Sequence, residues 1–287
     1  MAYKLLTERN LKSLRIFCAV SEAGGFSAAE KTLLLSKASI SRHIRDVEEA
    51  LGVTLCERGP GGFRLTVSGV AALKHAQAAL DSLSRIKPEV DEVRGLLSGT
   101  IRIGITEHVI NKQYDLPAIL SSYAQLAPDV TPDVRVMTFS QLNQALRERS
   151  IDVAIRGRYE QDSFFNFYPL FEERQKLFTL VGNEDKQLPL VYRSHPFVYE
   201  LLASRRYQKG PTANGLEAVA CLVASGGYMG VLPETYATEV WGYGQFVEVP
   251  KSPNFINIVC AIVEKFRPPS AAIELFIQQL QGRSTIT

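Results

Sequence analysis

Basic and hydroxyl side chains gather in one short stretch of the sequence, residues 36–45. Lysine and arginine neutralise DNA phosphates, and together with serine they also hydrogen-bond to base edges in the major groove. In the same region, Ile40, Ile44, Val47 and Leu51 recur at helical spacing and define one apolar face. The polar side chains therefore lie on the other faces of one helix. We assign Lys37, Ser39 and Arg42 to base edges, and Ser36, Ser41 and Arg45 to phosphates.

The preceding segments predict that this helix is the second half of a helix-turn-helix. Asn10 is expected to cap a first helix that ends at the glycine pair 24–25. Ser27 and Glu30 have the capping-box spacing for a second helix, which is expected to end near Leu33. Two short helices, a turn and a third helix with a basic N-terminal half indicate this motif. The pattern alone also allows an ordinary three-helix bundle with a solvated face.

A β-hairpin is predicted directly after the third helix. Residues 53–56 and 63–65 can pair as short strands, and the glycine- and proline-rich residues 57–62 suit the turn. A hairpin beside a DNA-reading helix can contact the DNA backbone. We therefore also assign Arg58 and Arg64 to phosphates.

A long helix follows, with Thr66 as its expected cap, and Pro88 is expected to kink or end it. Its apolar residues keep a 3-4 spacing that is typical of a helix seam. A small domain covers such a helix poorly, so we expect this stripe to pair with that of another subunit. Gly95 and residues 98–99 predict a hinge. The residues of the stripe are Leu73, Ala76, Leu80 and Leu83.

Composition supports these assignments and excludes others. Residues 1–75 carry 11 lysines and arginines against 7 acidic residues, whereas the rest of the chain is net negative. The four cysteines lack metal-site spacing, so neither a disulfide framework, a metal nor a cofactor is expected. No apolar run approaches the ~18 residues of a membrane span, and no leader opens the chain. We therefore expect a cytoplasmic protein.

The chain beyond residue 100 predicts alternating strands and helices. Strands are expected at 101–105, 134–137 and 151–155, with helices at 116–126 and 142–149 between them. This βαβαβ order predicts a parallel sheet. A second unit is expected from about residue 162. Its elements are a strand at 176–181, a helix at 197–206 and a helix-turn-strand at 216–232. A strand at 255–263 and a closing helix at 271–280 are expected after it.

Small ligands bind such sheets beyond the carboxyl ends of the strands, where three loops are expected here. Hydroxyls at Thr106 and Ser140 and the charge of Arg156 suit a carboxylate. Glu107 would repel an anion and could instead select an amine or amino acid. The alternatives are helix caps for the hydroxyls and a surface ion pair for the arginine. The candidate effector-binding residues are Thr106, Glu107, Ser140, Arg156 and Ser225.

Residues 14–70 carry many matches at fixed spacing to one family signature. They resemble the DNA-binding segment of LysR-type transcriptional regulators, and the similarity extends over the whole chain. Glu30 stands where the family has a second alanine, Lys37 where glutamine is usual, and Cys56 where an aromatic is usual. Lysine reads guanine or phosphate whereas glutamine favours adenine, so the family's base preference does not carry over. The matching residues are Phe17, Gly25, Phe26, Ser27, Ala29, Leu33, Leu35, Ser36, Ile40, Ser41, Ile44, Val47, Glu48, Leu51, Gly52, Leu55, Arg58, Leu65, Thr66 and Gly69.

The resemblance implies an α+β multidomain protein. It implies a winged helix-turn-helix at 1–66, a linker helix and hinge at 67–95, and an effector-binding domain at 96–287. That domain is expected to resemble periplasmic solute-binding proteins, with lobe I at 96–161 and 247–287 and lobe II at 162–246. The implied partners are a pseudo-palindromic double-stranded DNA site, a small-molecule effector, further copies in a homodimer or homotetramer, and RNA polymerase.

An enzyme is not expected, because the four histidines lie on different expected elements and no catalytic or nucleotide-binding motif occurs. Two alternatives stay open. One is a solute-binding protein without a DNA role, which the basic N-terminal module opposes. The other is a regulator that needs no effector.

Overall fold

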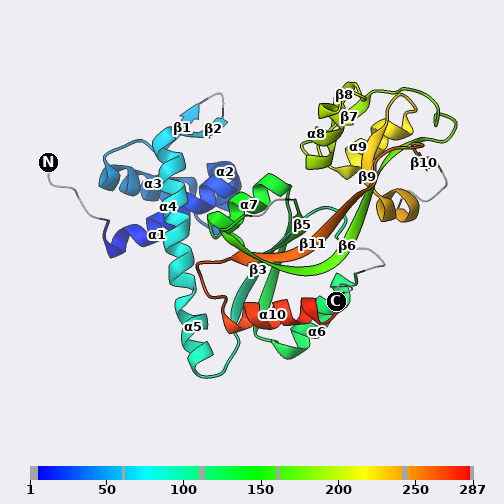
Figure 1. Ribbon diagram of the computed structural model, residues 1–287. Coiled ribbons are helices and arrows are strands. Elements are labelled where there is room, and N and C mark those ends of the chain that lie inside the picture. The colour runs from blue at the N-terminus through cyan, green and yellow to red at the C-terminus, as the bar shows by residue number, and fades with distance from the viewer. Residues whose placement is uncertain (1–5, 60–61, 110–113, 160–161, 241–244, 285–287) are drawn as a thin grey trace. The chain divides into compact units, whose positions relative to one another are not determined.

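The computed structural model describes residues 6–59, 62–109, 114–159, 162–240 and 245–284 (Figure 1). It divides into two compact units, Met1–Val90 and Asp91–Thr287. Asp91, at the start of the second unit, is buried, and the Ser98 hydroxyl donates to its carboxylate at 2.5 Å. Within the described ranges, no helix has both the length and the apolar character needed to span a membrane.

The first unit is three helices, a hairpin and a long helix. Its core is formed by the apolar faces of the helices, where Phe17, Ala29, Ile40, Ile44 and Val47 are fully buried. Leu51, expected to extend the apolar face of the third helix, is exposed because it lies in the last turn. The elements are α1 (Glu8–Glu22), α2 (Phe26–Leu33), α3 (Lys37–Leu51), β1 (Cys56–Gly59), β2 (Gly62–Leu65) and α4 (Val67–Ser84).

Two predicted helix caps are wrong. α1 begins after Thr7, whose amide donates to the Asn10 side chain at 2.8 Å, so Asn10 lies inside the helix. α2 begins one residue before Ser27, with Gly25 at its cap position (φ +144°) and no side-chain cap. The Glu30 carboxylate instead accepts a 3.2 Å hydrogen bond from the amide of Lys37. It thereby caps the next helix, α3.

The hairpin starts later than predicted. Residues 53–55 are not in a strand, because the Glu48 carboxylate accepts from the amides of Leu55 (2.8 Å) and Cys56 (3.4 Å). Pairing runs from Cys56 opposite Leu65 to the tip of the hairpin. Close packing of α4 fixes the base of the hairpin, since a Cβ on Gly69 would lie 1.9 Å from the Leu55 carbonyl oxygen.

The predicted kink of the long helix is confirmed. α4 ends at Ser84 and α5 runs over Ile86–Val93, with Pro88 as its third residue. Proline lacks an amide hydrogen and its ring clashes with the carbonyl four residues earlier, here that of Ser84. Part of the stripe on α4 packs within the unit, while Leu83 is exposed. Ala76 is buried, and Leu73 and Leu80 pack against the core of the same unit.

In the second unit, the predicted parallel arrangement is confirmed. β3 pairs in parallel with both β4 and β5. Three further strands belong to this sheet: β6 (Phe165–Leu180), β9 (Gly230–Pro233) and β10 (Phe246–Glu248). The strand order is β10-β6-β11-β5-β3-β4, and β9 also pairs with β6. α6 and α10 cover one face of β3 and β5, while α7 packs on the other (Figure 1). The bounds are β3 Gly99–Ile105, α6 Leu116–Leu126, β4 Val130–Val136, α7 Phe139–Arg147, β5 Val153–Arg158, β11 Phe255–Glu264 and α10 Ala271–Gln281.

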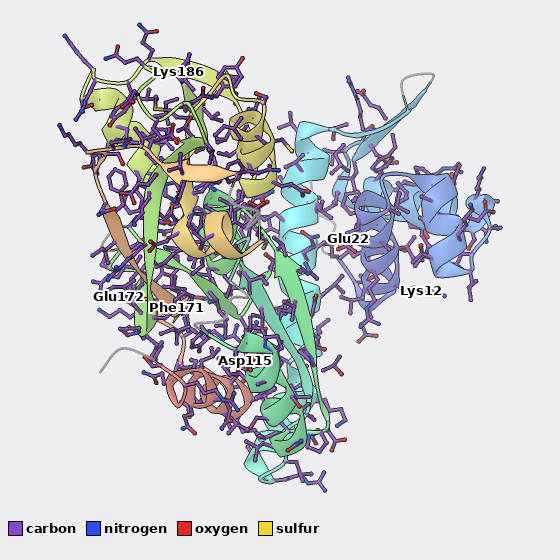
Figure 2. All side chains as sticks on the ribbon, turned by 90° about the vertical axis from the view of Figure 1, so that its right-hand side faces the viewer. Lys12, Glu22, Asp115, Phe171, Glu172 and Lys186 are labelled. Atoms are coloured by element: carbon purple, nitrogen blue, oxygen red, sulfur yellow. The ribbon has the colours of Figure 1, made fainter. Side chains whose placement is uncertain are left out.

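The strand predicted at 176–181 is the end of a much longer one, β6 (Phe165–Leu180). β6 pairs with β11 from Phe165 to Gln175 and then with β9 and β10. Two continuous strands therefore join the lobes, whose far regions carry Asp115 and Lys186 (Figure 2). A small parallel sheet of β7 and β8 was not predicted. The other bounds are β7 Leu190–Tyr192, α8 Pro196–Ala203, β8 Lys209–Thr212, α9 Leu216–Ala224, β9 Gly230–Pro233, a π-helix Tyr236–Val240 and β10 Phe246–Glu248.

Candidate functional site

α3 presents an exposed basic surface in the first unit. Ser36 caps this helix by accepting from the amide of Ser39 at 3.3 Å. Lys37, Arg42 and Arg45 are exposed, and in the described part of the chain none of these three cations forms an ion pair. Ser39 and Ser41 are half-buried beside them. The helix therefore offers uncompensated positive charge next to hydroxyl groups.

α3 is held to α1 by a buried polar contact that was not predicted. The Ser13 hydroxyl lies 2.9 Å from Nδ1 of His43, and Ser13 is almost fully buried. Serine facing histidine across two helices gives no signal in a single sequence. This hydrogen bond fixes the rotation of α3 and hence the direction of its basic face.

The hairpin carries the other predicted phosphate contacts. Arg64 is exposed on β2, where it pairs across the strands with Glu57. The Arg58 backbone lies in β1 opposite Phe63, but its side chain lies outside those that the structure describes. Phe63 packs edge-on against Phe26 of α2 at 5.9 Å, so the hairpin is anchored to the helix-turn-helix.

In the second unit, side chains of the loop that follows β3 in lobe I contact lobe II. The Glu107 carboxylate accepts a 2.7 Å hydrogen bond from the amide of Leu216, the first residue of α9. Gly215 precedes it at φ +92°, and a Cβ there would lie 2.6 Å from Glu107 Oε1. Nε2 of His108 lies 2.9 Å from the Thr235 hydroxyl, just after β9. Glu107 and His108 thus both contact lobe II.

Thr106 and Ser140 lie at the ends of neighbouring elements. Thr106 is half-buried, and its amide donates to the Ile155 carbonyl at 3.1 Å. Ser140 is exposed and lies inside α7, which starts at Phe139, earlier than predicted. Thr138 is the cap of α7, with its hydroxyl accepting from the amide of Gln141 at 3.4 Å.

Arg156 is buried rather than placed in a surface ion pair. It is 2% exposed, and Nη1 and Nη2 donate at 2.7 Å to the Gly157 carbonyl and the Asn143 side chain. Its guanidinium also lies 4.3 Å from the centre of the Phe139 ring. Ser225 lies at the C-terminal end of α9, where its hydroxyl donates to a backbone carbonyl. The structure therefore does not bring Ser225 together with Glu107, which contacts the other end of that helix.

A group of side chains that the sequence analysis missed lies around β6 and β11. Glu173 faces Asn257 across these strands, and Gln175 lies two residues further on the same face. Nε2 of Gln175 donates to Glu173 at 2.7 Å. The Tyr159 hydroxyl lies 2.9 Å from Nε2 of His195. We name as the polar cluster Tyr159, Glu173, Gln175, Arg193, His195 and Asn257.

Burial shifts the pKa values of the ionisable groups in the polar cluster. It raises the pKa of the Glu173 carboxyl, while the Gln175 hydrogen bond and Arg193 act in the opposite direction. Burial lowers the pKa of the Arg193 guanidinium, which Glu107 and Glu173 oppose. Burial, and secondarily Arg193, lowers the pKa of His195 to about 3, so this ring is uncharged at neutral pH. Burial also raises the pKa of the Tyr159 hydroxyl.

Two sequence signals could have revealed part of this cluster. Asn257 is a polar residue at an inward position of an apolar strand, between Phe255 and Val259. Arg193 directly follows the short strand β7, at a carboxyl end where ligands bind. Among the described residues, no group of His, Cys, Asp or Glu could hold a metal ion.

A winged helix-turn-helix unit followed by a two-lobed α/β unit defines a class of DNA-binding regulators with a ligand-binding domain. The profile of the bacterial regulatory helix-turn-helix proteins of the lysR family matches residues 11–70. The profile of the LysR substrate binding domain matches residues 94–285. The chain belongs to the LysR family of transcriptional regulators.

Individual relatives agree with this assignment. The chain is 26% identical to the HTH-type transcriptional activator BauR of Pseudomonas aeruginosa, over 95% of each chain. It is 36% identical to the probable regulator LrrA of Synechococcus elongatus, over 51% of this chain and 49% of that protein. Among solved structures, the LysR family regulator CbnR shares 19% identity at a TM-score of 0.68, covering 96% of this chain and 99% of CbnR. A full-length CbnR complex with its target DNA matches at a TM-score of 0.64 with 20% identity, over 96% of this chain and 99% of that one.

Proposed function

We propose that this regulator binds double-stranded DNA with the exposed basic face of α3 in the major groove. The uncompensated charges of Lys37, Arg42 and Arg45 carry this proposal, because buried or paired cations could not contact the duplex. Lys37, Ser39 and Arg42 read bases. The phosphate contacts come from Ser36, Ser41, Arg45, Arg58 and Arg64.

The functional segments are those inferred from the sequence: 1–66 for DNA binding, 67–95 as linker and 96–287 for effector binding. Exposed apolar residues on the linker helix, Val67, Val70, Ile86 and Val90, suit contact with a second copy. Such a dimer places two recognition helices about 34 Å apart on a pseudo-palindrome. Dimers associate further into tetramers and act on RNA polymerase in the cytoplasm.

Gel-shift titration with the DNA flanking the gene tests this proposal. We expect nanomolar binding to a pseudo-palindromic site and at least a thousandfold weaker binding to unrelated DNA. Equal affinity for both DNAs would exclude a sequence-specific regulator. Replacement of Lys37, Arg42 and Arg45 together with alanine should abolish the shift. The same replacement of Lys12, Lys31 and Lys74 removes equal charge elsewhere in the first unit and serves as the control.

In the second unit, a small molecule binds near Thr106, Glu107, Ser140 and Arg156, and so modulates DNA binding. Differential affinity for two arrangements of the protein is the physical requirement for such regulation. Footprinting with and without candidate metabolites tests it. A footprint that no metabolite changes, together with normal DNA binding, would favour an effector-independent regulator.

A further inference from the structure

The polar cluster contains buried atoms that the described residues do not satisfy. Gln175 and Asn257 are each 3% exposed. Gln175 Oε1, Asn257 Nδ2 and Arg193 Nε have no hydrogen-bond partner in the described part of the chain. The orientation of the Gln175 amide is fixed, because its Nε2 donates to Glu173. Leaving such groups unpaired is costly, so a bound molecule that supplies both an acceptor and a donor would satisfy them.

The same cluster holds charges of both signs. Glu173 and Arg193 have no ion-pair partner within 4.0 Å among the residues that the structure describes. A monoanion would stabilise Arg193 but would add a second negative charge near Glu173. A monocation would stabilise Glu173 at the expense of Arg193. A molecule with one group of each sign compensates both.

We propose that the polar cluster binds a small zwitterion, a free amino acid with its carboxylate towards Arg193 and its ammonium towards Glu173 and Gln175. This inference rests on the proposed function, in which the second unit binds the effector. His195 is held by Tyr159 and adds no third charge. Aromatic rings adjoin the cluster: Phe197 stacks on Phe255 at 4.4 Å and meets Tyr159 edge-on at 5.4 Å. These rings suit the methylene groups of such a ligand.

Calorimetry of the full chain tests the ligand class. The probes are the standard α-amino acids and unbranched ω-amino acids with two to six carbons. Each binder is compared with the matched carboxylate that lacks the amino group and with the matched amine that lacks the carboxylate. We expect one or more amino acids to bind, and both half-molecules to bind at least about 100-fold more weakly. Equal binding of a half-molecule, or no binding of any amino acid, would overturn the inference.

Two substitutions test whether the ligand binds at the polar cluster. Glu173→Gln and Arg193→Lys should each weaken binding by tenfold or more. Glu172→Gln and Arg174→Lys make the same chemical changes on the exposed, opposite face of β6 and should leave affinity unchanged. Thermal unfolding verifies that all four variants fold. Equal losses in the test and control pairs would place the ligand elsewhere.

Different experimental outcomes contradict the proposed DNA-binding function and the proposed ligand class. A chain that binds promoter DNA and changes its footprint only with a molecule of another class contradicts the zwitterion alone. A chain that binds an amino acid but no specific DNA contradicts the proposed function and leaves the ligand class intact.

Discussion

The carboxylate of Glu107 accepts a hydrogen bond of 2.7 Å from the backbone amide of Leu216, 109 residues further along the chain. Glu107 follows β3 of lobe I, and Leu216 begins α9 of lobe II. One side chain therefore caps a helix of the other lobe. The negative charge also complements the positive end of that helix dipole.

Replacing Glu107 with alanine should destabilise the second unit. Loss of a helix cap costs about 1 kcal/mol, and for a unit of this size that lowers the Tm by roughly 2–4 °C. Calorimetric unfolding of the full chain measures the change in the transition of this unit. Glu172→Ala, an exposed carboxylate on β6, is the control and should leave the Tm unchanged. An unaltered Tm for Glu107→Ala would show that the cap contributes no stability.

Replacing Arg42 with alanine should lower affinity for the preferred DNA site by about 1–3 kcal/mol and relax base preference at one position. The reason is that a base-edge contact distinguishes sequences, whereas a phosphate contact does not. Competition binding against a library of site variants measures both effects. Arg45→Ala should weaken binding to all sequences alike. If Arg42→Ala instead lowers the affinity for all sequences equally, Arg42 contacts a phosphate.

Replacing Arg64 with alanine should reduce the salt dependence of DNA binding. Each neutralised phosphate releases counterions, so the slope of log K against log salt should fall in magnitude by about 1. Titrations between 50 and 200 mM salt give that slope. Arg174→Ala, which removes an exposed arginine of the second unit, should not change it. An unchanged slope for the Arg64 variant would show that Arg64 of the hairpin does not contact a DNA phosphate.

Replacing Gly69 with alanine should severely destabilise the first unit. The new Cβ would lie 1.9 Å from the Leu55 carbonyl oxygen, so the backbone of the hairpin base or of α4 would have to shift. Overpacking of this kind costs about 1–3 kcal/mol or more. Urea unfolding should show the loss, and DNA affinity should fall with it. Ser68→Ala changes an exposed neighbour on α4 and should be close to neutral.

His195 should make the stability of the second unit depend on pH. Its pKa is lowered to about 3 in the folded chain and is about 6.5 when unfolded, so the unfolded state binds more protons between these values. The stability that His195 contributes is thus complete above pH 6.5 and is lost as the pH falls towards 3. Urea unfolding of the second unit at pH 7 and pH 4 should show a smaller loss for His195→Gln than for the parent chain. Equal losses would mean that His195 is not buried in its neutral form.

The elements with regular apolar spacing were predictable. The buried face of α3, the kink before Pro88 and the parallel β3, β4 and β5 all follow from local pattern. The misplaced cap at Ser27 and the late start of the hairpin have a common cause: a glutamate side chain accepts from a backbone amide seven residues further along the chain. Glu30 binds the next helix instead of its own, and Glu48 replaces strand pairing at Leu55.

The candidate ligand site was less predictable because it is assembled across strands. Asn257 and Glu173 are neighbours only through the register of β11 on β6, and β6 was predicted at less than half of its length. Arg193 follows a three-residue strand that lacks a clear pattern. By contrast, Glu107 was recognised from its position after β3, although its contact with α9 depends on packing between the lobes.

β6 and β11 pass between the lobes without a break, and their register shifts between Val259 and Cys260, where β11 also pairs with β5 of lobe I. Two-stranded ribbons twist more strongly than wide sheets, and a bulge adds a local bend. A rearrangement of the lobes by twisting or bending this ribbon would keep its hydrogen bonds intact. The stiffness of the two strands would then limit how far the lobes can move relative to each other.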